Sequence, residues 1–155
     1  MEKELLVPFI QATSEIITEL TGTKPQPGEV SVIDALTTSL GIVTLVGITG
    51  DLEGRVILDM DNSTAQKYSE TLLQDNVDIN DVELIGSAIG EIINMIAGRA
   101  LTALTEMGYH LRITPPTTIT GDNLNITDKS GKMLVIPFET KLGKIVLNLA
   151  VVRSG

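Results

Sequence analysis

The sequence predicts an α+β fold in which one mainly antiparallel sheet of about six strands packs against helices. Amphipathic segments with the 3.6-residue hydrophobic period occur in both halves of the chain. Short apolar runs separated by Gly- and Pro-containing turns, typical of antiparallel strands, follow the first and last of these segments. The 155 residues contain no linker or low-complexity stretch, so we expect a single domain over residues 1–155.

The first half is expected to begin with a helix from Lys3 to Leu20, which Gly22 and the Pro-rich turn 25–28 end. A second helix, capped by Asn62 or Ser63, is expected to run to about Leu73. Between the two helices, the strands predicted by apolar and β-branched runs are Val30 to Leu36, Ile42 to Ile48 and Arg55 to Met60.

The second half begins with the longest predicted element, a helix from Asn80 to Met107. Residues 80–83 have the form of a capping box, and Gly108 supplies the stop signal. An irregular stretch is expected at Pro115 to Thr118. The strands predicted around it are Leu111 to Thr114, Met133 to Phe138 and Ile145 to Val151.

Two internal matches indicate an old duplication. Residues 14–22 align with residues 90–98, sharing a Glu, two Ile and the final Gly, and residues 54–59 align with 143–148. Each half would then supply one helix and one hairpin to a pseudo-symmetric sheet.

Composition excludes several classes of function. Without cysteine the chain has no disulfide, thiolate nucleophile or Cys-zinc site. A formal charge of -9 disfavours nucleic acid, which requires clustered basic residues. The single His110 enters a predicted strand, and no Gly-x-Ser-x-Gly motif accompanies it, so a Ser-His-Asp catalytic triad is disfavoured. No signal-like or membrane-spanning run is evident, so we expect a cytoplasmic protein with no membrane partner and no metal or cofactor bound by the chain itself.

The long helix has two faces of different character. At 100° per residue, Glu91 and Asn94 lie one turn apart on the polar side and point together toward solvent or a partner. The opposite side is predicted to face the core and contains Val82, Ile85, Ile89, Ile92, Ile93, Ile96, Ala100, Ala103, Leu104 and Met107.

The composition of the polar side is unusual for a helix that only faces solvent. Gly90, Asn94 and Gly98 each have lower helix propensity than Ala, by roughly 0.5–1 kcal/mol. The small residues Ser87 and Gly98 leave room for another backbone to approach. That backbone belongs either to a partner or to a neighbouring element of this chain, and the sequence leaves both interpretations open.

The runs Ser87–Gly98, Ile113–Thr117 and Val46–Gly50 together resemble the CheX branch of the CheC/CheX/FliY phosphatase family. The resemblance covers nearly the whole chain and implies a pseudo-duplicated CheC-like fold. It implies that Glu91 and Asn94 are the catalytic pair. At the corresponding place in the first half, Glu15 is followed by Thr18 instead of Asn, so that site is expected to be inactive.

The resemblance also implies the substrate, a phosphorylated CheY-like response regulator that brings its own Mg²⁺. It further implies a homodimer formed by edge strands, and the strands that we consider for this interface lie within Val30 to Ile48. Asn94 would align a water for in-line attack on the aspartyl-phosphate, and Glu91 would pair with the regulator's lysine. The residues expected to contact the partner around this pair are Ser87, Gly90, Gly98 and Thr102.

Two other functions are considered. The same helix face could dock a response regulator or a flagellar-switch component without hydrolysis, and release of inorganic phosphate distinguishes this binding module from an enzyme. A small-ligand site would rest only on Thr117, Thr118 and Thr120, whose hydroxyls are better explained as partners of strand and turn backbone.

Overall fold

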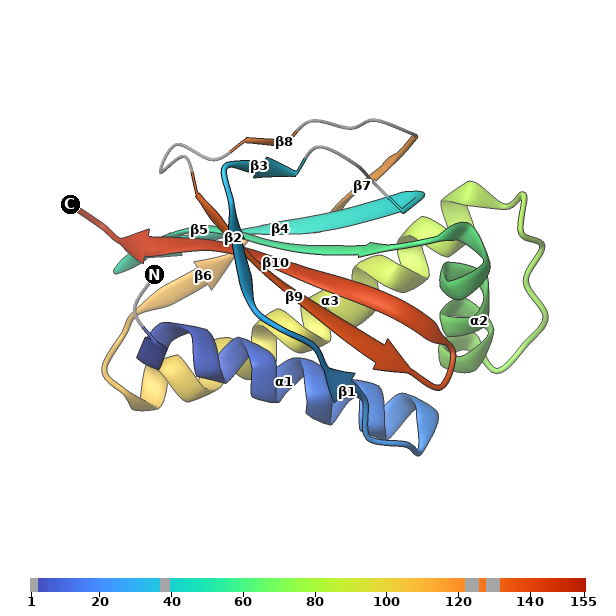
Figure 1. The fold of residues 1–155 in the computed structure, drawn as a ribbon, viewed down its shortest axis with the longest axis horizontal. Coiled ribbons are helices and arrows are strands. Elements are labelled where there is room, and N and C mark those ends of the chain that lie inside the picture. Colours follow the sequence, from blue (N-terminus) through green and yellow to red (C-terminus); the bar gives the residue numbers. More distant parts are fainter. Residues whose placement is uncertain (1–2, 37–39, 122–125, 128–131) are drawn as a thin grey trace.

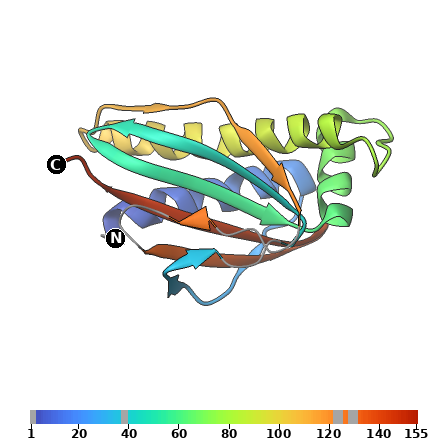
Figure 2. The same cartoon turned by 90° about the horizontal axis from the view of Figure 1, so that it is seen from above.

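The computed structural model describes residues 3–36, 40–121, 126–127 and 132–155. Two long helices, α1 (Lys3–Thr21) and α3 (Val82–Glu106), lie side by side on one face of an antiparallel sheet, and α2 (Asn62–Leu73) packs at one end of it (Figures 1 and 2). The α+β fold with helices packed on a mainly antiparallel sheet is confirmed.

The main sheet has eight strands rather than about six, because short strands extend both of its edges. Its order is β1–β9–β10–β5–β4–β6, with β2 also paired to β9 and β7 also paired to β4. The strands are β1 (Gln26–Pro27), β2 (Ser31–Ile33), β4 (Ile42–Gly50), β5 (Leu52–Met60), β6 (Leu111–Ile113), β7 (Thr117–Thr120), β9 (Met133–Thr140) and β10 (Gly143–Arg153). A separate two-stranded sheet joins β3 (Ala35–Leu36) to β8 (Ile126–Thr127).

This strand order confirms the predicted pseudo-symmetric sheet, to which each half supplies one hairpin. The hairpins β4–β5 and β9–β10 meet at the centre, and the short strands of each half flank the hairpin of the other half. At the centre of the β5–β10 ladder, Leu58 pairs with Leu147. These two leucines occupy the same position in the aligned segments 54–59 and 143–148, so a pseudo-two-fold axis passes through this pair and relates α1 to α3.

The main core lies between the sheet and the helices. The predicted apolar face of α3 is buried from Ile85 to Leu104 except for Ala103, which is half-buried, and Val82 and Met107 at its two ends are exposed. The prediction that these end residues face the core is therefore wrong. A smaller cluster of Val43, Ile57, Met133 and Ala150 lies apart from the main core.

The helix starts differ by one residue from the sequence prediction. Asp61, rather than Asn62 or Ser63, caps α2, and its carboxylate accepts a hydrogen bond from the Thr64 amide at 2.7 Å. Asp81, rather than Asn80, caps α3 by accepting from the Leu84 amide at 3.1 Å, and because Leu84 is the third helical residue the predicted capping box gives way to a single N-cap bond. In both cases the carboxylate satisfies an amide of the first helical turn.

The strand predicted from Val30 to Leu36 is divided. Ser31–Ile33 pair with β9 in the main sheet, whereas Ala35–Leu36 pair with β8 in the small sheet. The chain changes partner at Asp34. This change depends on pairing with distant segments, which the local apolar pattern does not encode.

Asn148 of β10 is fully buried, and neither end of its side-chain amide has a hydrogen-bond partner among the described residues. Its neighbours across the ladders are Ile57 of β5 and Val135 of β9, both apolar. An unsatisfied buried polar group generally costs about 1–3 kcal/mol. We expect Asn148→Val to raise the free energy of unfolding by about this amount in urea titrations. This account would be contradicted if Asn148→Val lowered the free energy of unfolding and Asn148→Asp lowered it no further than the Val variant does.

Candidate functional site

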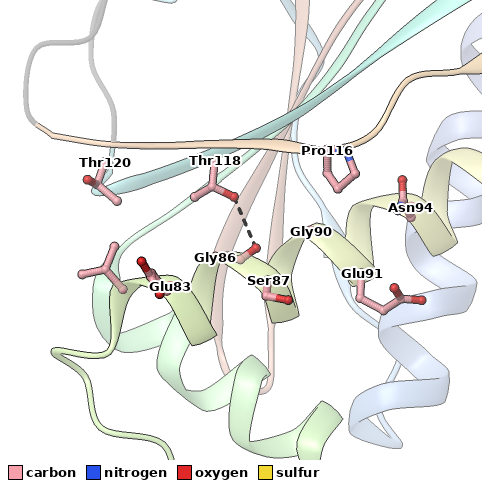
Figure 3. Close-up of a pocket in the computed structure, with 10 residues that line it drawn as sticks. Glu83, Gly86, Ser87, Gly90, Glu91, Asn94, Pro116, Thr118 and Thr120 are labelled. Carbon is pink, nitrogen blue, oxygen red and sulfur yellow. Dashed lines mark hydrogen bonds between the residues drawn. The ribbon is translucent and has the colours of Figure 1, made fainter.

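The candidate site is a groove between α3 and the segment that joins β6 to β7. It has a volume of about 540 Å³ and is open to solvent. Both residues of the predicted catalytic pair line it (Figure 3). The other lining residues are Val82, Glu83, Gly86, Ser87, Gly90, Pro116, Thr118 and Thr120.

One wall of the groove is a short arch at residues 114–116. Thr114 still belongs to the sheet edge, since its amide donates to the Gly47 carbonyl at 3.0 Å and its Oγ1 accepts from the Gly47 amide at 2.8 Å. Pro115 and Pro116 have no N–H to donate to β4. Pairing resumes only at Thr117, opposite Leu45. The two prolines therefore interrupt the pairing of the edge with β4, and Pro116 lies against α3.

Two glycines of α3 allow this close approach. A Cβ atom at Gly90 would lie 3.1 Å from Pro116 Cγ, and one at Gly86 would lie 3.3 Å from Thr118 Cγ2. Thr118 Oγ1 also donates to the Gly86 carbonyl at 3.3 Å. The glycines, which weaken the helix, are thus explained by packing within the chain. Gly90 is buried but also lines the groove beside Pro116, so its contact with a partner stays a prediction.

The remaining partner-contact candidates are accessible. Ser87 and Thr102 are exposed, and no atom outside the local helix lies within 4 Å of a Cβ built at Gly98. Thr102 Oγ1 donates to the Gly98 carbonyl at 3.0 Å. A second groove of about 640 Å³ runs along Gly98 and Thr102 toward α1 and also includes Asn94. Asn94 therefore lies where the two grooves meet.

The two predicted catalytic side chains differ in their surroundings. Glu91 is exposed, and its carboxylate has no ion pair within the described part of the chain. Asn94 is half-buried, and its Oδ1 is buried with no hydrogen-bond partner in the described part of the chain. In Figure 3 the Asn94 side chain rises toward the side of α3 on which Pro116 lies, whereas Glu91 extends away from Pro116. The expectation that both side chains reach outward holds fully for Glu91 and for one end of Asn94.

The corresponding place on α1 has a different character. Glu15 is exposed, but the Thr18 hydroxyl donates to the Ser14 carbonyl of its own helix at 2.7 Å. Nearby, Arg99 of α3 forms an ion pair with Glu19. The hydrogen bond from Arg99 lowers the pKa of the Glu19 carboxyl below its usual value. At the position that corresponds to Asn94, Thr18 therefore supplies a hydroxyl and not a carboxamide.

Alanine replacement of Glu15 and Thr18 is therefore expected to leave phosphate release unchanged. The Thr18 hydroxyl is already bonded within α1, and a hydroxyl lacks the donor and acceptor pair of an amide. Steady-state assays of the double variant test this expectation. A large loss of activity in a protein that melts like the wild type would assign the chemistry to α1 instead of α3.

Among the described residues, no three His, Asp or Glu side chains gather in a way that could hold a metal ion. His110 is exposed, and its backbone amide donates to Asp51 at 2.7 Å in the turn before β6. Its own side chain does not line the groove. Thr118 donates to a backbone carbonyl of α3, and Thr120 of β7 pairs with Ile42 of β4. Both contacts agree with the interpretation that these threonines support the backbone.

Within the described chain, α3 is long and apolar enough to meet the criteria for a membrane span. Slightly more than half of its most apolar window, 56%, is buried inside the protein. The buried side faces α1, α2 and the sheet. Its hydropathy is thus that of a central core helix.

Comparisons with known proteins agree with this fold and site. The family described as Chemotaxis phosphatase CheX matches residues 42–139, a range that contains α3 and the arch but not α1. A relative from Thermotoga maritima named CheY-P phosphatase CheX is 33% identical over 138 residues, which cover 88% of each chain. The chain belongs to the CheX family of chemotaxis phosphatases.

Solved structures of the family superimpose over nearly the whole chain. The chemotaxis protein CheX from Desulfovibrio desulfuricans has a TM-score of 0.83 at 29% identity and covers 96% of this chain and 99% of its own. CheX in the CheX–CheY–BeF3–Mg²⁺ complex from Borrelia burgdorferi has a TM-score of 0.80 at 31% identity, with coverage of 96% and 97%.

Sequence reasoning found the helix and its polar pair but missed the arch. Pro116 and Thr118 form a wall of the groove; Pro116 was predicted only as part of an irregular stretch, and Thr118 was considered only for a small-ligand site. A signal was present, because Gly86 and Gly90 lie one turn apart on α3. Such a pair marks close approach of another backbone, but it does not identify which one.

Proposed function

We propose that this chain hydrolyses the aspartyl-phosphate of a CheY-like chemotaxis response regulator in the cytoplasm. The observation that carries the proposal is that Glu91 and Asn94, one helical turn apart, line the same solvent-open groove. Membership of the CheX family and the CheX–CheY complex of the Borrelia relative support the choice of substrate.

Asn94 would align the attacking water. In an in-line displacement the water oxygen bonds to phosphorus as the bond to the aspartate oxygen breaks, which releases inorganic phosphate and regenerates the aspartate carboxylate. A carboxamide can accept a hydrogen bond from the water with its oxygen and donate to a phosphoryl oxygen with its nitrogen. Alignment of this kind needs no strong base.

Glu91 would anchor the helix to the regulator. Its carboxylate is exposed and has no ion pair within the described residues, so it is available for the lysine of the regulator's phosphorylation site. Such a charge-assisted contact would hold α3 against the acyl phosphate. The Mg²⁺ would come with the regulator, and the Borrelia complex contains Mg²⁺ together with CheY.

Release of inorganic phosphate tests the proposal. The protein is mixed with phosphorylated response regulators from its own organism, and phosphate is measured over time against regulator alone. Acceleration by the wild type supports the enzyme. Binding without acceleration would leave only the docking role on the same helix face.

We also propose a homodimer in which β2 strands pair at the sheet edge. The strands considered from the sequence, Val30 to Ile48, include β4. Because β4 lies inside the sheet between β5 and the β6–β7 edge, it is excluded as the interface strand. Within the described residues β2 pairs only with β9, and Val32 in β2 and Val30 just before it are 58% and 45% exposed. An apolar open edge of this kind favours pairing.

Light scattering at micromolar concentration is expected to give twice the chain mass of 16.6 kDa. Val32→Lys, which places a charge on the open edge, is expected to give a monomer. A monomeric wild type, or a Lys variant that remains dimeric, would remove this edge as the interface.

A further inference from the structure

The orientation of the Asn94 carboxamide is not fixed by hydrogen bonds. Its Oδ1 is buried without a partner, and no bond of its nitrogen occurs with the described residues. The terminal torsion of an Asn side chain is broad, so an amide held by no polar contact rotates unless packing confines it. Alignment of a water nevertheless requires a defined orientation. The neighbouring atoms must therefore supply it.

The arch is the element that can confine this amide. It packs against α3 one turn before Asn94, through Pro116 Cγ over the bare backbone of Gly90. The Thr114 end of the arch is tied to the sheet through Gly47, and Thr118, in the strand that follows the arch, donates to Gly86 of α3. Pro116 and Asn94 line the same groove, with the Asn94 side chain on the Pro116 side of the helix (Figure 3).

We propose that Pro116 is a positioning residue for the reaction and acts through its contact with Gly90. The contact sets the height of the arch above α3, and the arch holds one end of the Asn94 amide inward so that the other end faces the substrate. This inference rests on the proposed hydrolysis and extends it by assigning a role to a residue that need not touch the phosphoryl group.

The contact can be perturbed from either side. Gly90→Ala adds a Cβ at 3.1 Å from Pro116 Cγ, so the arch must shift by a few tenths of an ångström. Pro116→Ala removes Cγ and leaves the arch unsupported. Each single change is expected to lower kcat about 10-fold with KM unchanged, because water alignment is lost while the partner surface remains. In the double variant the added methyl fills the space left by Cγ, and kcat is expected to return to within about 3-fold of the wild type.

Rescue separates positioning from mere stability. Gly90→Ala also raises helix propensity, so Thr105→Ala, an exposed change on the same helix far from the arch, serves as the propensity control and is expected to keep full activity. The side-chain amide signal of Asn94 in ¹H–¹⁵N spectra is expected to shift in each single variant and to return in the double variant, whether or not regulator is present.

Each outcome decides the inference. Single variants as active as the wild type, or a double variant with no recovery, overturn it. If Gly90→Ala fails to fold, Pro116→Ala alone decides through its kcat. An inactive wild type defeats the proposed hydrolysis but not the packing relation between Pro116 and Asn94. The Asn94 amide signal then tests that relation, and an unchanged signal in both single variants overturns it.

Discussion

Replacing Asn94 with Ala is expected to lower the rate of regulator dephosphorylation about 100-fold, which corresponds to about 2.7 kcal/mol of transition-state stabilisation. The loss arises because no other described residue of the groove presents a carboxamide. Affinity for the regulator is expected to stay within a few-fold, since Glu91, Ser87 and the rest of the face are unchanged. Turnover and affinity should therefore separate.

The same substitution is expected to leave the fold intact. Ala has higher helix propensity than Asn by some tenths of a kcal/mol. The change also removes a buried oxygen that has no partner. Thermal melts of Asn94→Ala should therefore match or slightly exceed those of the wild type. A variant with normal turnover, or one whose lost turnover is matched by lost affinity, would contradict a water-aligning role.

Changes at Glu91 are expected to affect binding and turnover together. Glu91→Ala removes the proposed contact with the regulator's lysine, which exists before the reaction as well as during it, so KM should rise and kcat/KM should fall. Glu91→Lys should be worse because it places like charges together. Both effects should shrink with added salt, because the carboxylate is exposed.

A charge-matched control is available at Glu53. This residue is exposed at the start of β5 and does not line either groove that contains Asn94. Glu53→Lys changes the net charge by the same amount and should leave kcat/KM nearly unaltered. If both Lys variants lose activity equally, the effect is one of overall charge, and the specific contact at Glu91 is disproved.

The sequence was most informative about α3. Its period of 3.6 residues separates Ile89, Ile92 and Ile93 from Glu91 and Asn94, and the structure buries the first set and leaves Glu91 exposed. The internal repeat was also visible, because Leu58 and Leu147 occupy equivalent positions. Both are local patterns or matches that survive in a single sequence.

Features created by contacts between distant segments could not be predicted. Pro115 and Pro116 predicted only an irregular stretch, and their packing over α3 depends on how β6 and β7 pair with β4. The burial of Gly90 follows from that packing. The burial of Asn94 Oδ1 was missed for the same reason, since helical periodicity alone places the side chain on an open face.

The lifetime of the aspartyl-phosphate on the cognate regulator tests the central claim most directly. The regulator is phosphorylated, freed of phosphodonor, and followed alone, with wild-type protein and with the Asn94→Ala variant, under conditions in which both proteins are shown to bind. We predict that the wild type shortens the lifetime severalfold or more and that the variant leaves it near that of the regulator alone. A wild-type protein that binds the phosphorylated regulator but leaves the lifetime unaltered would contradict the enzymatic account.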